Sequence, residues 1–135
     1  MLRGMEMRSL WMKLLAAVIS GLLVACLFPP IDVGFLVWVA LMPLLAAVWS
    51  FEPKRAGWKG FLTGWLAGTV SCLVQVQWGA VVSWVGAIAL PDYLGLYWGI
   101  FGAFAATLGN PRRLGGKPTP LRTAFFLAAM WGGLE

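Results

Sequence analysis

Residues 60–91 read GFLTGWLAGTVSCLVQVQWGAVVSWVGAIALP, without one charged side chain. A helix needs about 20 mainly apolar residues to cross the roughly 30 Å of hydrocarbon in a bilayer. Three further uncharged stretches lie on either side: Leu14–Ile31, Val33–Phe51 and Tyr93–Asn110. The sequence therefore predicts an all-α fold, a polytopic transmembrane helix bundle with four complete spans plus the start of a fifth.

The composition points the same way. Of 135 residues, 61% are hydrophobic and 11% charged, against about a quarter charged in an average soluble domain. Four spans use nearly the whole chain, so no separate soluble domain is expected. The net charge of +5 is spread over short loops beside the spans, and we therefore predict membrane phospholipid as a partner and no nucleic acid.

The basic residues predict the orientation of the bundle. They cluster before the first stretch, between the second and third, and after the fourth: Arg3, Arg8, Lys13; Lys54, Arg55, Lys59; Arg112, Arg113, Lys117, Arg122. Spans that alternate in direction place all three clusters on one face, which the positive-inside rule assigns to the cytoplasm. Both ends of the chain are therefore predicted to be cytoplasmic, with Asp32 and Asp92 at the outer face.

The expected boundaries follow from these charges and from the prolines. Pro29 and Pro30 should end the first span, because proline cannot donate a helix hydrogen bond, and Asp32 should lie in the outer turn. Pro43 should kink the second span, and Asp92 should cap the fourth helix. We expect a basic lead and one membrane domain, with spans and an outer segment at these positions: 1–13 and 14–135; spans 14–28, 33–51, 60–78 and 93–109; outer segment 79–90.

A fifth apolar segment begins at residue 124. The segment Ala124–Leu134 is too short to cross a bilayer, and the sequence ends at Glu135 with no closing basic cluster. We therefore expect the sequence to be part of a longer protein.

Small residues recur every fourth position on the third span, at Gly60, Gly64 and Gly68. This spacing lines one helix face and lets a neighbouring backbone approach closely. Gly95 and Gly99 offer a matching face on the fourth span. We predict helix packing through these glycines, with a lipid or substrate groove as the alternative.

Candidate binding residues lie where the third span should reach the outer interface. Gln75, Gln77 and Trp78 are predicted to contact lipid or substrate, and a hydrogen-bonded structural pair is the alternative. Cys26 follows a basic lead and Leu-Val-Ala, as a lipidated cysteine does after a signal peptide, but another apolar span follows it, so packing is the preferred interpretation. Cys72 is likewise interpreted as a buried small hydrophobe.

The sequence contains few residues that could take part in catalysis. The chain contains no histidine, and the four apolar stretches contain no charged residue, which argues against an ion-coupled transporter. Cys72 has no base near it, since Lys59 is roughly 20 Å away along the helix. We predict no catalytic residue, no metal site and no cofactor.

The order of several motifs resembles a known family, the apolipoprotein N-acyltransferases. The resemblance covers roughly Leu14 to Glu135, and the motifs that carry it are a proline turn, a Trp–Pro segment and two later elements: LFPPIDVG (27–34), WVALMPLL (38–45), PLR (120–122) and WGGLE (131–135). The family usually has Trp-Val-Tyr-Val-Ser after the third span, where this chain has WGAVVS (78–83).

The resemblance implies the N-terminal membrane region of an enzyme of the bacterial inner membrane. That enzyme moves an acyl chain from phospholipid through a cysteine thioester to the N-terminal diacylglyceryl-cysteine of lipoproteins. The family's Glu–Lys–Cys triad belongs to a nitrilase-like domain beyond residue 135, so this chain alone is predicted to be inactive. The apolipoprotein is expected to bind only where that domain is supplied.

Two other interpretations stay open. The chain could be a complete small integral membrane protein that binds lipid or packs against a partner, as the glycine face and the missing chemistry suggest. Alternatively, Cys26 could carry a lipid.

Overall fold

The computed structural model describes residues 2–29, 31–77, 81, 83–111 and 120–134, and these residues form helices and no strand. In chain order the elements are α1 (Leu2–Ala25), η1 (Gly34–Trp38), α2 (Met42–Trp49), η2 (Pro53–Arg55), α3 (Ala56–Gln75), α4 (Trp84–Ala106) and α5 (Pro120–Leu134). The η elements are 3₁₀ helices. The prediction of an all-helical protein is confirmed over the described residues.

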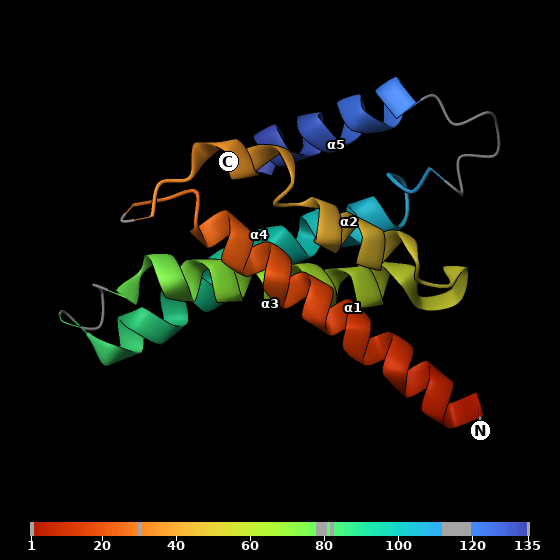
Figure 1. Ribbon diagram of the computed structural model, residues 1–135, viewed down its shortest axis with the longest axis horizontal. Coiled ribbons are helices and arrows are strands. Elements are labelled where there is room, and N and C mark those ends of the chain that lie inside the picture. Colours follow the sequence, from red (N-terminus) through yellow and green to blue (C-terminus); the bar gives the residue numbers. More distant parts are fainter. Residues whose placement is uncertain (1, 30, 78–80, 82, 112–119, 135) are drawn as a thin grey trace.

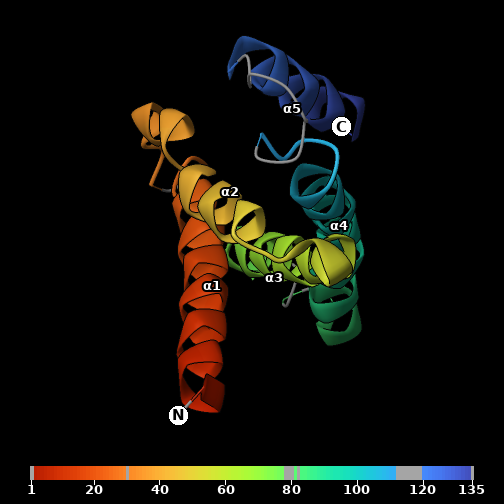
Figure 2. The same ribbon diagram turned by 90° about the vertical axis from the view of Figure 1, so that its right-hand side faces the viewer.

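The chain runs back and forth along the long axis of the molecule (Figure 1). Helices α1 and α3 run in one direction, and α2 and α4 return in the other. Helix α3 lies between α1 and α4 and packs most extensively against α4 (Figure 2). Helix α3 is therefore the central element of the bundle.

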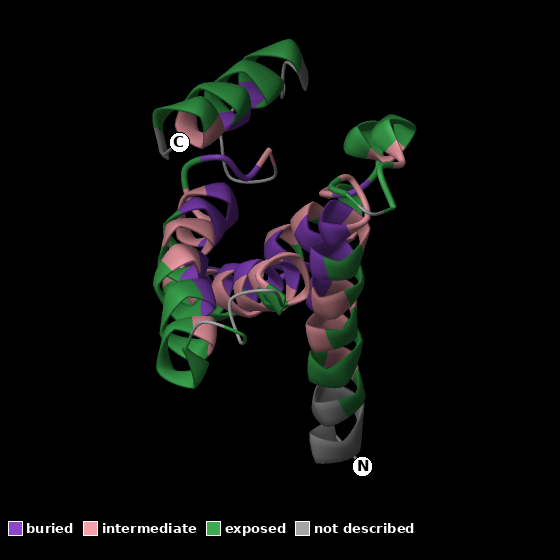
Figure 3. Cartoon of the chain, turned by 90° about the vertical axis from the view of Figure 1, so that its left-hand side faces the viewer, coloured by how far each residue is buried: buried purple, intermediate pink, exposed green. Residues whose placement is uncertain are grey.

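Buried residues gather where the helices meet, whereas the outward faces of α1 and α4 are exposed (Figure 3). The core includes Ala17, Leu44, Ala67 and Phe101. The exposed face of α1 is itself apolar, with Leu15, Ile19 and Leu22 each more than 40% exposed. A continuous apolar surface of this kind suits contact with lipid rather than with water.

Glycines let α3 and α4 approach backbone to backbone. A Cβ atom added at Gly60 would lie 2.5 Å from the carbonyl oxygen of Gly102, and one added at Gly68 would lie 2.5 Å from the Trp98 ring. A Cβ atom at Gly99 would lie 2.7 Å from the Phe61 ring. A side chain at Gly60 would push the two helices apart. At Gly68 and Gly99 an aromatic ring would have to move instead, so the close spacing favours glycine there as well.

Helix α1 differs from the expected first span at both ends. The helix begins at Leu2, so the basic lead expected over residues 1–13 is largely its first half. It ends at Ala25, and the turn that follows contains Pro29. Asp32 adopts a φ of 52° in this connection, a left-handed conformation that asparagine and aspartate tolerate better than most residues. Pro30 lies outside the described residues.

The second expected span is broken. A 3₁₀ segment and a turn precede α2, an eight-residue helix of about 12 Å, which is too short to cross a bilayer by itself. Pro43 was expected to kink a long helix, but it lies in the first turn of α2. A proline is tolerated there because the first N–H groups of a helix have no partner within it.

Helix α4 begins at Trp84, nine residues before the expected fourth span. Ser83 is its N-cap, and the Ser83 hydroxyl accepts a hydrogen bond from the Gly86 N–H at 3.3 Å. The prediction that Asp92 caps this helix is therefore wrong, because Asp92 lies in its interior. Most of the segment predicted as a separate outer element, residues 79–90, forms the start of α4, while residues 79, 80 and 82 are outside the described part of the chain.

Length and composition identify two to three candidate membrane spans among the described residues. Arg8–Ala25 and Trp84–Ala106 each qualify as single helices. Gly34–Trp49 and Pro53–Gln75 qualify only together, as a pair bent by 106°. The prediction of four complete spans goes beyond this count.

Candidate functional site

A cavity of about 440 Å³ lies between α1, α3, α4 and α5. It is lined mainly by apolar and aromatic side chains, with a few polar groups among them: Val24, Phe28, Ser71, Cys72, Gln75, Tyr93, Leu94, Tyr97, Trp98 and Trp131. None of these described lining residues carries a formal charge at neutral pH. The cavity is therefore suited to an apolar ligand or to the apolar part of an amphipathic one.

Two short polar pairs face the cavity from neighbouring helices. On α3, the Gln75 side-chain amide donates a 2.8 Å hydrogen bond to the hydroxyl of Ser71, one turn earlier. On α4, the hydroxyl groups of Tyr93 and Tyr97 lie 2.9 Å apart. Each pair is spaced i, i+4, so both members lie on one face of their helix. Amide and hydroxyl groups are therefore available to an ester or phosphate oxygen.

Helix α5 contributes an aromatic wall through Trp131. The Trp131 ring meets Trp98 edge to face at a centroid distance of 4.9 Å, and it meets Phe101 in the same way at 5.2 Å. Both of these partners belong to α4. Two members of this aromatic cluster, Trp98 and Trp131, thus line the cavity on the side of α5.

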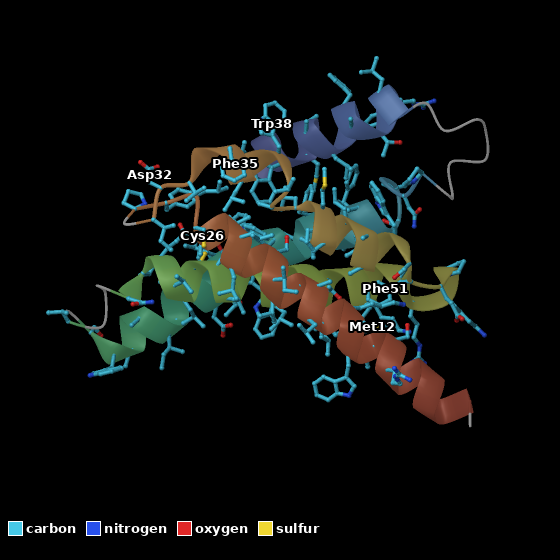
Figure 4. All side chains as sticks on the ribbon, viewed as in Figure 1. Met12, Cys26, Asp32, Phe35, Trp38 and Phe51 are labelled. Carbon is cyan, nitrogen blue, oxygen red and sulfur yellow. The ribbon has the colours of Figure 1, made fainter. Side chains whose placement is uncertain are left out.

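The cavity lies at one end of the bundle, and the basic residues Lys13, Lys54, Arg55 and Lys59 lie at the other. Figure 4 shows Cys26 and Asp32 at the cavity end, and Met12 and Phe51 at the opposite end. At that opposite end the amine of Lys13 donates to the Ser50 carbonyl at 3.3 Å. Along α3, the distance from Lys59 to Gln75 is about 24 Å at 1.5 Å per residue.

The three residues predicted to contact lipid or substrate do not all lie at the cavity. Gln75 lines the cavity, Gln77 is exposed and does not line it, and Trp78 lies outside the described residues. The glycines predicted to pack lie along α3 and α4 and are not among the residues that line the cavity. Pro29 and Asp32 lie in the connection after α1.

Sequence reasoning missed most of the cavity. Ser71, Tyr93, Tyr97 and Trp131 line it, and none of them was predicted to bind a ligand, although Trp131 belongs to one of the family motifs. One signal was present: Tyr93 and Tyr97 are the only two tyrosines in the chain, and they stand one helical turn apart. Cys72 also lines the cavity, and both Cys26 and Cys72 are free cysteines.

Candidate spans, exposed apolar helix faces and a cavity between helices define an α-helical integral membrane protein. The family described as apolipoprotein N-acyltransferase N-terminal domain matches residues 20–135, and the chain belongs to this family. The resemblance seen in the sequence motifs is thereby confirmed.

Two curated relatives are both described as apolipoprotein N-acyltransferase. The protein from Geobacter metallireducens is 34% identical over 131 residues, which cover 90% of this chain and 23% of that protein. The protein from Gloeobacter violaceus is 33% identical over 135 residues, covering 90% of this chain and 24% of its own length. The chain thus spans about a quarter of the length of these relatives. No solved structure matches the chain.

Proposed function

We propose that this chain acts as the membrane platform of an apolipoprotein N-acyltransferase. The whole enzyme would transfer an acyl chain from phospholipid to the N-terminal diacylglyceryl-cysteine of a lipoprotein. The observation that carries the proposal is the family match over residues 20–135. The described residues of the cavity supply no charged group, so the chain alone is not expected to catalyse the transfer.

The cavity suggests what the platform does with its substrates. A volume of about 440 Å³ falls within the roughly 300–1,000 Å³ typical of small-molecule sites. Its apolar walls would hold part of a lipid acyl chain, and Gln75 with the two tyrosine hydroxyls would bind the polar end. Gln75 therefore remains a proposed lipid contact, now together with Tyr93 and Tyr97.

The proposed orientation places the cavity toward the outer leaflet and both ends of the chain in the cytoplasm of a bacterial inner membrane. Lys13 and Lys59 approach the same Phe51 ring at the end opposite the cavity, as the positive-inside rule requires of a cytoplasmic face. Within this arrangement α1, the broken η1–α2 segment, α3 and α4 are the four proposed crossings. Helix α5 would begin a fifth.

Cysteine labelling tests this orientation. In a background of Cys26→Ala and Cys72→Ala, Asp32→Cys should react with a membrane-impermeant maleimide in intact cells. Lys54→Cys should react only after the membrane is permeabilised. Labelling of both positions from the same side would contradict the proposed crossings.

A chimera tests the function itself. Residues 20–135 would replace the matching N-terminal quarter of the Geobacter metallireducens relative, in cells depleted of their own N-acyltransferase. We expect the chimera to restore the N-acyl group on lipoproteins, measured by mass spectrometry of the N-terminal lipopeptide. Two controls, the relative without its N-terminal quarter and this chain alone, should leave the α-amino group free.

A chimera that inserts stably into the membrane but adds no acyl group to lipoproteins would contradict the proposed function. If this chain nevertheless bound phospholipid in that case, the interpretation as a lipid-binding membrane module would take its place.

A further inference from the structure

At the end of the bundle away from the cavity, a second pocket of about 290 Å³ lies at the start of α3. Glu52, Lys54, Arg55 and Lys59 line it. Three cations and one carboxylate thus line a single concave surface. Such a pocket attracts an anion, because its charge is unbalanced.

A fourth cation reaches this region from another helix. Lys13 of α1 holds its amine 4.6 Å from the centre of the Phe51 ring, where it also donates to the Ser50 carbonyl. The amine of Lys59 lies 5.9 Å from the centre of the same ring. Phe51 is only 6% exposed, so the ring is fixed by the core. The fold therefore holds two like charges from distant parts of the sequence close together.

The surroundings indicate that the anion belongs to a membrane surface. Trp11 and Trp58 flank Lys13 and Lys59 along their helices and are 67% and 64% exposed. Tryptophans at the ends of membrane helices typically lie at the level of the lipid headgroups. An anion at this depth is the phosphate of a phospholipid.

We propose that Lys13, Lys54, Arg55 and Lys59 form a binding site for the phosphate of an anionic phospholipid in the cytoplasmic leaflet. Orientation of a membrane protein requires only that basic residues lie in the right loops. Here the amine of Lys13 is instead held by a carbonyl and a buried ring, and the other three cations line one pocket. This arrangement is more specific than orientation demands.

This site goes beyond the proposed acyl transfer and lies at the other end of α3 from the cavity. It rests on the proposed placement in a membrane and not on any step of the reaction. A chimera that fails to acylate lipoproteins would therefore not contradict this binding site, and a failure to bind phospholipid here would not contradict the proposed acyl transfer.

Native mass spectrometry of the purified protein in a neutral detergent provides the test, with phosphatidylglycerol and phosphatidylcholine as the two probes. We expect phosphatidylglycerol to bind more tightly. Lys59→Gln and Lys54→Gln should each weaken its binding about fivefold, the effect of removing one basic residue near an anionic surface. Glu52→Gln should strengthen binding, since it removes the one carboxylate of the pocket. Lys59→Arg should retain binding.

The matched control is Arg122→Gln, which removes an exposed cation on α5 that stacks on the Phe126 ring. Binding should be unchanged in this variant. Equal binding of the two lipids, or equal weakening by Arg122→Gln and Lys59→Gln, would overturn the proposal. Displacement of phosphatidylglycerol by inorganic phosphate at matched concentration would also overturn it, in favour of a soluble anion. Circular dichroism of each variant separates loss of binding from loss of folding.

Discussion

Gly64→Leu is expected to abolish most of the folded protein. A Cβ atom at Gly64 would fall on the carbonyl oxygen of Trp98 and lie 3.1 Å from the Cα of Gly102. These are backbone atoms of α4, which cannot turn aside as the end of a flexible side chain can. We expect a loss in free energy of unfolding of about 3 kcal/mol, the upper part of the usual range for overpacking. The yield of monodisperse protein and the thermal unfolding of that protein in detergent measure this loss.

Gly132→Leu is the matched control for this change. It introduces the same side chain into a helix, but nothing lies within 4 Å of a Cβ atom built at Gly132. This variant should unfold at or slightly above the temperature of the parent protein, because leucine is a better helix former than glycine. Gly64→Ala should also destabilise, since the clash begins at Cβ. Normal stability of Gly64→Leu would mean that α3 and α4 pack through other faces.

Phe101→Ala is expected to have the second largest effect. Phe101 is 2% exposed, belongs to the core and meets Trp131 edge to face. In soluble cores such truncations cost about 3–5 kcal/mol, which combines a transfer term and a cavity term. Lipid tails are as apolar as the core, so mainly the packing term remains, and we expect about 2–3 kcal/mol in the free energy of unfolding.

Phe125→Ala serves as the comparison, because Phe125 on α5 is 68% exposed. It should change the unfolding temperature little. Because Trp131 rests on Phe101, the Phe101 variant should also change the intrinsic fluorescence of the tryptophans, whereas the Phe125 variant should not. Equal destabilisation by both variants would contradict the assignment of Phe101 to the core.

The helical fold was predictable from the sequence because composition alone dictates it. Lipid offers no hydrogen bonds, so an apolar chain must satisfy its backbone internally. The close approach of α3 and α4 occurs at glycines that recur every fourth residue in the sequence, at Gly60, Gly64 and Gly68. Both features depend on local patterns.

The breaks in the helices were harder to predict from the sequence. Residues 33–51 contain no charged residue, and hydrophobicity does not distinguish a 3₁₀ segment and a turn from a continuous helix. At α4 the expected boundary followed Pro91 and Asp92, although the cap is Ser83. A proline costs a helix one hydrogen bond and does not always end it.

The cavity could not be predicted, because it depends on which helices are neighbours. Gln75 was singled out for its polarity at the end of a span, whereas Tyr93 and Trp131 line the same cavity only through the packing of α4 and α5. Their separation in the sequence gives no indication that they share a cavity. A polar residue in an apolar helix was recognisable, but the other residues of its cavity were not.

The length of α3 has a consequence for the surrounding bilayer. On the proposed placement, Lys59 and Gln75 mark the two ends of its apolar part, about 24 Å apart, whereas an average bilayer has roughly 30 Å of hydrocarbon. The glycine contact with α4 leaves this helix little freedom to adjust. The mismatch is therefore met by the lipid, which must thin locally around the protein, and by lysine side chains that extend toward the headgroups. On that placement, the protein would set the thickness of the membrane locally, around α3.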